Sequence, residues 1–196
     1  MLRRFLDSRV RKASWRQVLV CALLFAVSYS VINFSEIGQA GLLRLTGGAN
    51  MLDVLFGYTC QEAYDALTAL GAEGRAFYLT RIAPQDILLP FLYMLFFAST
   101  ITLLLKHTTP ERVAGIGKYL LPLPVLAMLF DWSENIGTVT LTISYPSLPE
   151  WAVHLASVSG ILKTVWTTAC LAVIVLLCAL YAASKITKKL HERRFN

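Results

Sequence analysis

The chain has 196 residues, of which 56% are hydrophobic and only 15% are charged, with a formal net charge of +6. Soluble domains carry roughly 25% charged residues, so this balance excludes a disordered tail and argues against an ordinary soluble domain. The four cysteines form no Cys-x-x-Cys pair. The sequence therefore predicts neither a zinc site nor a thioredoxin-like redox centre, and we expect no metal and no cofactor.

Four segments are long and apolar enough to cross a bilayer, which takes about 20 mostly apolar residues. They are residues 18–34, 87–105, 119–143 and 162–184. Short connections make the second, third and fourth segments antiparallel neighbours. We therefore predict an all-α protein, with one membrane domain over residues 1–196 in which four transmembrane helices form an antiparallel bundle.

The orientation follows from the basic residues that flank the segments. Fourteen of the 18 Lys and Arg residues lie before the first segment, between the second and third, or after the fourth. This asymmetry predicts a multi-pass protein of the bacterial plasma membrane with both termini in the cytoplasm. The basic ends suit anionic lipid headgroups, so we expect contacts with membrane lipid and none with nucleic acid. A cleaved signal peptide ending near Gly38-Gln39-Ala40 is the alternative for the first segment.

The outer connection, residues 35–85, is too long to be a hairpin loop and needs structure of its own. Thr59 and Glu62 have the spacing of a capping box at a helix start. Four apolar residues then follow at helical spacing: Ala63, Ala66, Leu67 and Leu70. Gly71 is a typical helix stop. We predict a short amphipathic surface helix over about residues 60–70.

The third segment carries the most informative residues. Asp131, Glu134 and Asn135 are spaced i, i+3, i+4 and so share one helix face. A carboxylate at the bilayer centre costs about 2.5–3.5 kcal/mol, so two of them should face the bundle interior or water rather than lipid. Asp131 and Glu134 are candidate catalytic residues, as acid and base or as groups that stabilise a cation, and Asn135 is a candidate ligand-binding residue.

Other polar or aromatic residues lie at similar depth on the remaining segments, all in the outer half. The candidate ligand-binding residues among them are Tyr29, Asn33, Glu36, Asp86, Tyr93, Lys163 and Trp166. The inner halves are almost purely apolar, so the pattern predicts a pocket that opens outward and not a pore. Pro90 frees a backbone carbonyl in the wall of that pocket.

Each of these residues also has a structural interpretation. The acids and Asn135 could join helices by hydrogen bonds. Asp86 could be a favourable charge at a helix N-terminus. Lys163 could reach the headgroups or neutralise Glu134. Trp166 could belong to an interfacial aromatic belt.

Some of these residues also resemble a known family. Gly71-x-x-Gly74-Arg75-x-x-Tyr78 precedes the segment that carries Asp86, and Asp131-x-x-Glu134-Asn135 lies in the next. This pattern resembles a family of small, uncharacterised bacterial four-span integral membrane proteins, over roughly residues 55–180. The resemblance implies a four-helix membrane fold and no known activity.

Three functions remain open at this stage. The leading hypothesis is a pocket in the bundle that binds or modifies a small amphipathic or lipid-like ligand through Asp131 and Glu134. The second is a structural or assembly subunit, as a homo-oligomer or within a larger membrane complex. The third is a proton- or cation-coupled transporter, against which the apolar inner halves and the lack of an inverted repeat argue.

Overall fold

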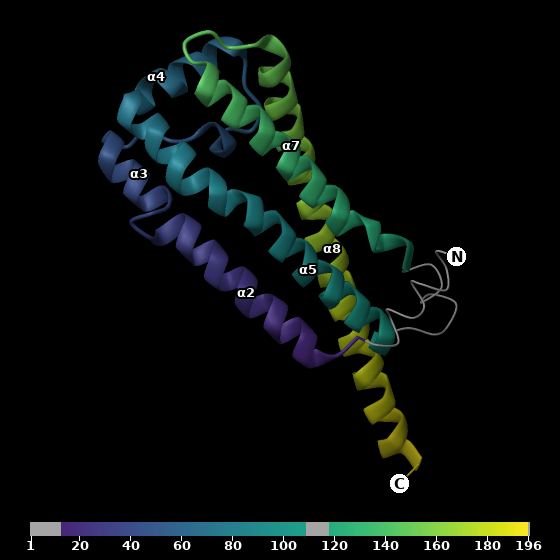
Figure 1. Ribbon diagram of the computed structural model, residues 1–196. Coiled ribbons are helices and arrows are strands. Elements are labelled where there is room, and N and C mark those ends of the chain that lie inside the picture. The colour runs from purple at the N-terminus through teal and green to yellow at the C-terminus, as the bar shows by residue number, and fades with distance from the viewer. Residues whose placement is uncertain (1–12, 109–117, 196) are drawn as a thin grey trace.

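The computed structural model describes residues 13–108 and 118–195, and within these ranges the chain is helical with no strand (Figure 1). Its α-helices are α2 (Trp15–Phe34), α3 (Gln39–Thr46), α4 (Cys60–Phe77), α5 (Ala83–Thr108), α7 (Pro122–Ser144) and α8 (Glu150–Phe195). Short helices connect them: η1 (Leu52–Val54), η2 (Tyr78–Ile82) and η3 (Lys118–Leu120). The prediction of an all-α protein is confirmed for the described residues.

Three helical stretches are long and apolar enough to cross a membrane, which identifies a multi-pass membrane protein. They are Trp15–Thr46, Cys60–His107 and Glu150–Ile186. The third predicted span is also a helix, the 23-residue α7, but Asp131, Glu134 and Asn135 in its middle lower its mean hydropathy. The basic residues of 1–12 and Arg112, on which much of the predicted orientation rests, lie outside the described residues.

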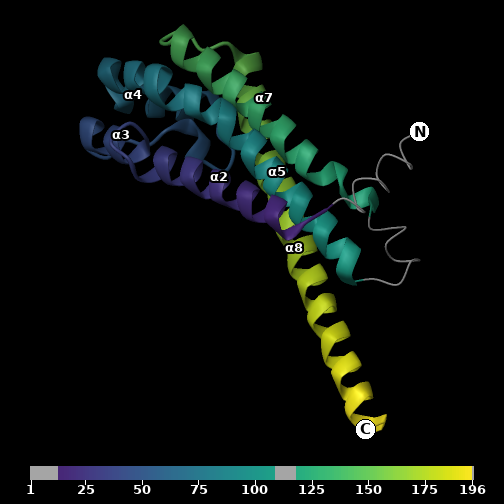
Figure 2. The same ribbon diagram turned by 60° about the horizontal axis from the view of Figure 1, so that its bottom comes forward.

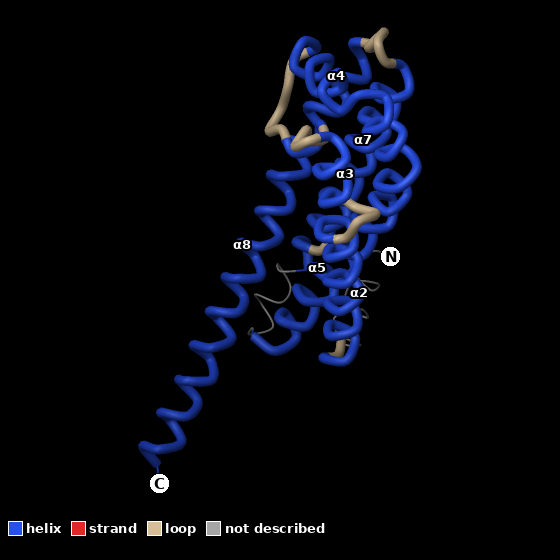
Figure 3. The backbone as a smooth tube through the Cα atoms, turned by 90° about the vertical axis from the view of Figure 1, so that its left-hand side faces the viewer, coloured by secondary structure: helices blue, strands red, loops and turns tan. Residues whose placement is uncertain are grey.

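Helix α8 begins earlier than the apolar pattern indicates. The sequence predicts a span from residue 162, whereas the helix starts at Glu150 and continues without a break. Lys163 therefore lies well inside α8 and not near its start. Figure 3 shows α8 running along the whole bundle and projecting beyond it at its C-terminal end.

The predicted helix begins at Cys60 with the expected cap and breaks at Gly71, although α4 continues beyond that break to Phe77. Thr59 caps α4 with its side chain while the Glu62 carboxylate accepts from the Thr59 backbone N–H, at 2.8 Å. At Gly71 the backbone has φ +65°, a left-handed conformation that glycine adopts without a steric penalty. The helix direction changes there, and the chain then continues through the π-helical turn η2 into α5.

Helix α5 lies at the centre of the bundle, packed against α2, α7 and α8 (Figure 2). The most extensive contact in the molecule is between α7 and α8. Small residues make it possible: a Cβ on Gly137 would lie 2.7 Å from the Cβ of Ala156, and one on Gly160 would lie 2.5 Å from Oε1 of Glu134. Small residues at such positions let membrane helices approach closely.

Residues 51–58, which we call the strap, pack onto α7 and α8 at the end of the bundle nearest α4. Met51, Leu52 and Tyr58 are buried in the apolar cluster that includes Leu141 of α7 and Val153 of α8. The strap is also tied down by its backbone, because the N–H of Tyr58 donates to Oγ of Ser157 at 2.9 Å. The strap therefore covers this end of the helices.

Candidate functional site

The candidate site is built around the proline in α5. Pro90 has no N–H, so the carbonyl of Asp86, one turn earlier, loses its usual partner within the helix. Helix α7 supplies the replacement, since Nδ2 of Asn135 donates to the Asp86 carbonyl at 2.9 Å. Nε1 of Trp132 donates to the next carbonyl, that of Ile87, at 3.0 Å. The two donors bind α7 to the turn of α5 that precedes Pro90.

Asp131 lies one helical turn before Asn135 and is 5% exposed. Its Oδ2 accepts a hydrogen bond from the hydroxyl of Tyr93 at 3.1 Å. This partner is neutral and reaches Asp131 from α5. The contact therefore orients the carboxylate without balancing its charge.

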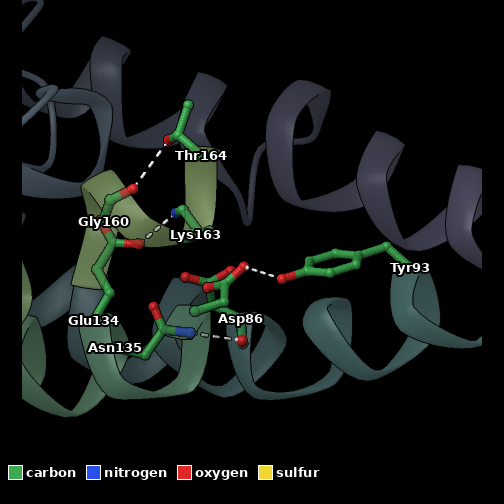
Figure 4. Close-up of polar contacts among 8 residues, drawn as sticks. Asp86, Tyr93, Glu134, Asn135, Gly160, Lys163 and Thr164 are labelled. Atoms are coloured by element: carbon green, nitrogen blue, oxygen red, sulfur yellow. Dashed lines mark hydrogen bonds and ion pairs between the residues drawn. The ribbon is translucent and has the colours of Figure 1, made fainter. Parts of the chain in front are cut away.

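Glu134 is 1% exposed and forms an ion pair with Lys163 of α8, whose side chain is 23% exposed. Figure 4 shows both side chains pointing into one interior space, with Glu134 beside the backbone of Gly160. The absence of a side chain at Gly160 makes room for the carboxylate. Of the two interpretations of Lys163, the structure shows the one in which it neutralises Glu134.

Asp86 is the third buried acid, 8% exposed, and its side chain points toward the same space (Figure 4). Its backbone carbonyl is bonded to Asn135, but its carboxyl group has no hydrogen bond or ion pair among the described residues. It interacts electrostatically with Asp131 and with Lys163. Asp86 is thus a buried carboxyl group with no dedicated partner.

The strap adds a fourth acid that sequence reasoning missed. Oδ1 of Asp53 is buried with no hydrogen-bond partner among the described residues, as are the hydroxyls of Tyr58 and Thr138. Burial raises the pKa of Asp53 above its usual value, and the nearby Lys163 offsets only part of that effect. No spacing pattern links residue 53 to α7, so only the packing of the strap reveals it.

The predicted ligand residues of α2 and of the turn after it make their contacts elsewhere. The ring of Tyr29 packs against Phe25 and Phe34, and Asn33 donates to the Tyr29 carbonyl at 2.9 Å. Glu36 is exposed and forms an ion pair with Arg44 of α3. These contacts stabilise α2 and its turn into α3, and none of them is made with Asp131 or Glu134.

Trp166 adjoins the cluster from α8. Its ring packs against the apolar group formed by Tyr93, Phe97, Ala127 and Cys170. Its Nε1 is buried with no acceptor among the described residues. Trp166 is therefore half-buried, with its ring against the bundle and its N–H turned away from solvent.

A groove of about 600 Å³ opens between the start of α5 and the middle of α7. Its lining is almost entirely apolar, and Asn135 is the one residue with a polar side-chain amide among the residues that line it. The lining residues are Leu79, Ala83, Pro84, Ile87, Trp132, Asn135, Ile136 and Val139. Small-molecule sites are typically mostly apolar pockets of this size with a few placed polar groups. Asn135 thus connects the groove to the buried acids.

No group of three or more His, Cys, Asp or Glu side chains within 13–108 and 118–195 is arranged to hold a metal ion. No protein-family model, no curated protein and no solved structure matches this chain.

Proposed function

We propose that this protein binds a small amphipathic or lipid-like ligand within a four-span antiparallel bundle. The apolar part of the ligand occupies the groove between α5 and α7, and its polar end reaches the acids beside Asn135. The observation that carries the proposal is the position of Asn135, which lines the groove and donates a hydrogen bond to the backbone carbonyl of Asp86. The roles of Asp131 and Glu134 as catalytic acid and base remain predictions.

The length and surface of α7 support its assignment as a membrane span in addition to the three long apolar stretches. Its 23 residues extend about 35 Å at 1.5 Å per residue, enough for a hydrocarbon core of about 30 Å. Its acids and Asn135 are buried against the neighbouring helices. The large apolar side chains that it exposes suit lipid: Val125, Leu129, Ile136 and Ile143. We place both termini in the cytoplasm, on the basis of the basic flanks.

The ligand enters from the bilayer in this proposal. The strap packs over the end of α7 and α8, whereas the groove lies on the side of the bundle between α5 and α7. With the termini in the cytoplasm, the groove lies at the depth of the outer leaflet. The sequence pattern predicts a pocket that opens toward the outer face. We propose instead that the ligand enters sideways, through the groove between α5 and α7.

A second function is favoured by the same contacts. Lys163–Glu134, Asn135–Asp86 and Tyr93–Asp131 each join two different helices. Such pairs stabilise a bundle without any ligand, as in a structural or assembly subunit. The groove is the feature that this alternative leaves unexplained.

Native mass spectrometry of the protein released from gently solubilised membranes separates the two functions. We expect a bound small molecule or lipid on the wild type and its loss from the Asp131→Asn/Glu134→Gln variant. Because that variant also removes a helix contact, Ile136→Trp is the second test, since Ile136 is 59% exposed and lines the groove. Ile143→Trp is its matched control, because Ile143 lies on the same face of α7 two turns further on, is 66% exposed and does not line the groove.

Loss of the bound mass from Ile136→Trp and not from Ile143→Trp would support the proposal. If the wild type and all variants are equally well folded and carry no bound mass, the groove is not a ligand site. The acids would then be interpreted as helix contacts of a structural subunit.

A further inference from the structure

The charges around the groove are unbalanced. Four buried or partly buried acids interact electrostatically with one another: Asp53, Asp86, Asp131 and Glu134. Among the described residues, Lys163 is the basic side chain that acts on all four, and its ammonium group forms an ion pair with Glu134. Ionised carboxylates are costly within a bilayer unless a positive charge or a proton accompanies them. The site therefore has a place for a further positive charge.

Asp86 and Asp131 mark that place. Asp131 accepts a hydrogen bond from the neutral hydroxyl of Tyr93 at 3.1 Å and interacts with Asn135. The one cation that acts on it in the described structure, Lys163, is shared with Glu134. Asp86 is 8% exposed, and its carboxyl group has no hydrogen-bond or ion-pair partner there. Asn135, which lines the groove, is bonded to the backbone of Asp86. Neither acid lines the groove itself, so Asn135 is the groove-lining residue through which a ligand there would approach them.

We infer that the polar end of the ligand is a cationic amine, held between Asp86 and Asp131, on a single apolar chain that fills the groove. This inference rests on the proposed function and specifies the chemical class of the ligand. An ammonium group would supply the missing positive charge and donate hydrogen bonds to both carboxylates. A fatty acid or the phosphate of a phospholipid headgroup would place a negative charge beside them, which is unfavourable.

Three probes with the same tail and different heads test this inference. The wild-type protein in phosphatidylcholine nanodiscs is equilibrated with dodecylamine, dodecanol and dodecanoate, each at the same membrane concentration, and bound probe is measured by native mass spectrometry. We expect dodecylamine to be retained about tenfold more than dodecanol, since a hydrogen bond to a charged group contributes about tenfold or more in affinity. Dodecanoate should be retained least.

Matched substitutions locate the effect. Asp86→Asn and Asp131→Asn keep the side-chain shape and should each remove the preference for the amine while dodecanol retention stays the same. Asp65→Asn is the control, because Asp65 is an exposed acid of α4 that accepts from Gln61. The amine preference should survive that change. Thermal unfolding in the same nanodiscs verifies that each variant is folded.

The outcomes separate this inference from the proposed function. Equal retention of the amine and the alcohol, or a preference for dodecanoate, would overturn the cationic head while leaving the groove as a ligand site. An amine preference that persists in both Asp86→Asn and Asp131→Asn would overturn it as well. If no probe is retained above the level of Ile136→Trp, the proposed function itself fails.

Discussion

Helices α2 and α7 have similar lengths but differ in the kind of side chain that they bury. The 20-residue α2 buries only Val18 and Ile32 and exposes leucines and valines such as Leu23. The 23-residue α7 buries Asp131 and Glu134 and exposes isoleucines. In lipid, exposed apolar side chains cost nothing, whereas buried polar groups need matched partners. The comparison indicates that the specific polar contacts between helices are made by α7 and its neighbours. Helix α2 packs on α5 and otherwise exposes apolar side chains.

The largest effect should come from removing one member of the buried ion pair. Lys163→Met would leave Glu134 in the interior without its cation, which costs about 3–5 kcal/mol. Leu23→Ala on exposed α2 should change stability by about 0.5 kcal/mol or less. Unfolding in detergent micelles measures both changes.

The double variant Lys163→Met/Glu134→Gln is the control for that prediction. Removing both charges leaves no unpaired ion, so most of the lost stability should return. If the single variant is no less stable than the double, the pair does not control the packing of α7 on α8.

A smaller effect should follow from adding bulk to the same helix pair. Gly137→Leu would place side-chain atoms where Ala156 already lies, since even a Cβ would be 2.7 Å away. Overpacking of this kind typically costs about 1–3 kcal/mol. Ala26→Leu on the exposed surface of α2 adds the same type of side chain and should be close to neutral. Equal effects of the two substitutions would contradict the proposed contrast between the helices.

The bond between Asn135 and the Asp86 carbonyl should contribute about 1 kcal/mol, the usual value for one hydrogen bond. Asn135→Ala removes it and leaves the carbonyl freed by Pro90 without a partner. In a Pro90→Ala background, the new N–H at position 90 can bond that carbonyl within α5. Asn135→Ala should then cost measurably less in a double-mutant cycle. An unchanged cost would mean that Asn135 acts through other contacts.

Local signals predicted some elements well. The capping box at Thr59 and the helix stop at Gly71 depend on neighbours within a few residues, and both are confirmed. The spacing of Asp131, Glu134 and Asn135 predicted one shared face, and all three are buried. Helical periodicity alone is enough for such statements, because it does not require knowledge of the partner.

Features that depend on the partner could not be predicted in this way. Pro90 indicated a free carbonyl, but only the packing of α7 identifies Asn135 as its donor. The candidate residues Tyr29, Asn33 and Glu36 share a depth with the acids, yet depth does not fix the direction in which a helix faces. Asp53 lies in a connection without periodicity, so nothing local distinguishes it from a solvated aspartate.

That buried aspartate gives the last and smallest expected effect. Because burial raises the pKa of Asp53 in the folded protein, its ionisation opposes folding at every pH above its unfolded value of about 4. Asp53→Asn should therefore be more stable than the wild type at neutral pH, and the difference should shrink as the pH falls toward 4. Thermal unfolding in detergent between pH 4 and pH 8 measures this, with the exposed Asp65→Asn as control. A difference that grows on acidification would mean that the ionised Asp53 carboxylate stabilises the strap, as a partner of Lys163, and that α7 and α8 depend on the strap for charge as well as for apolar cover.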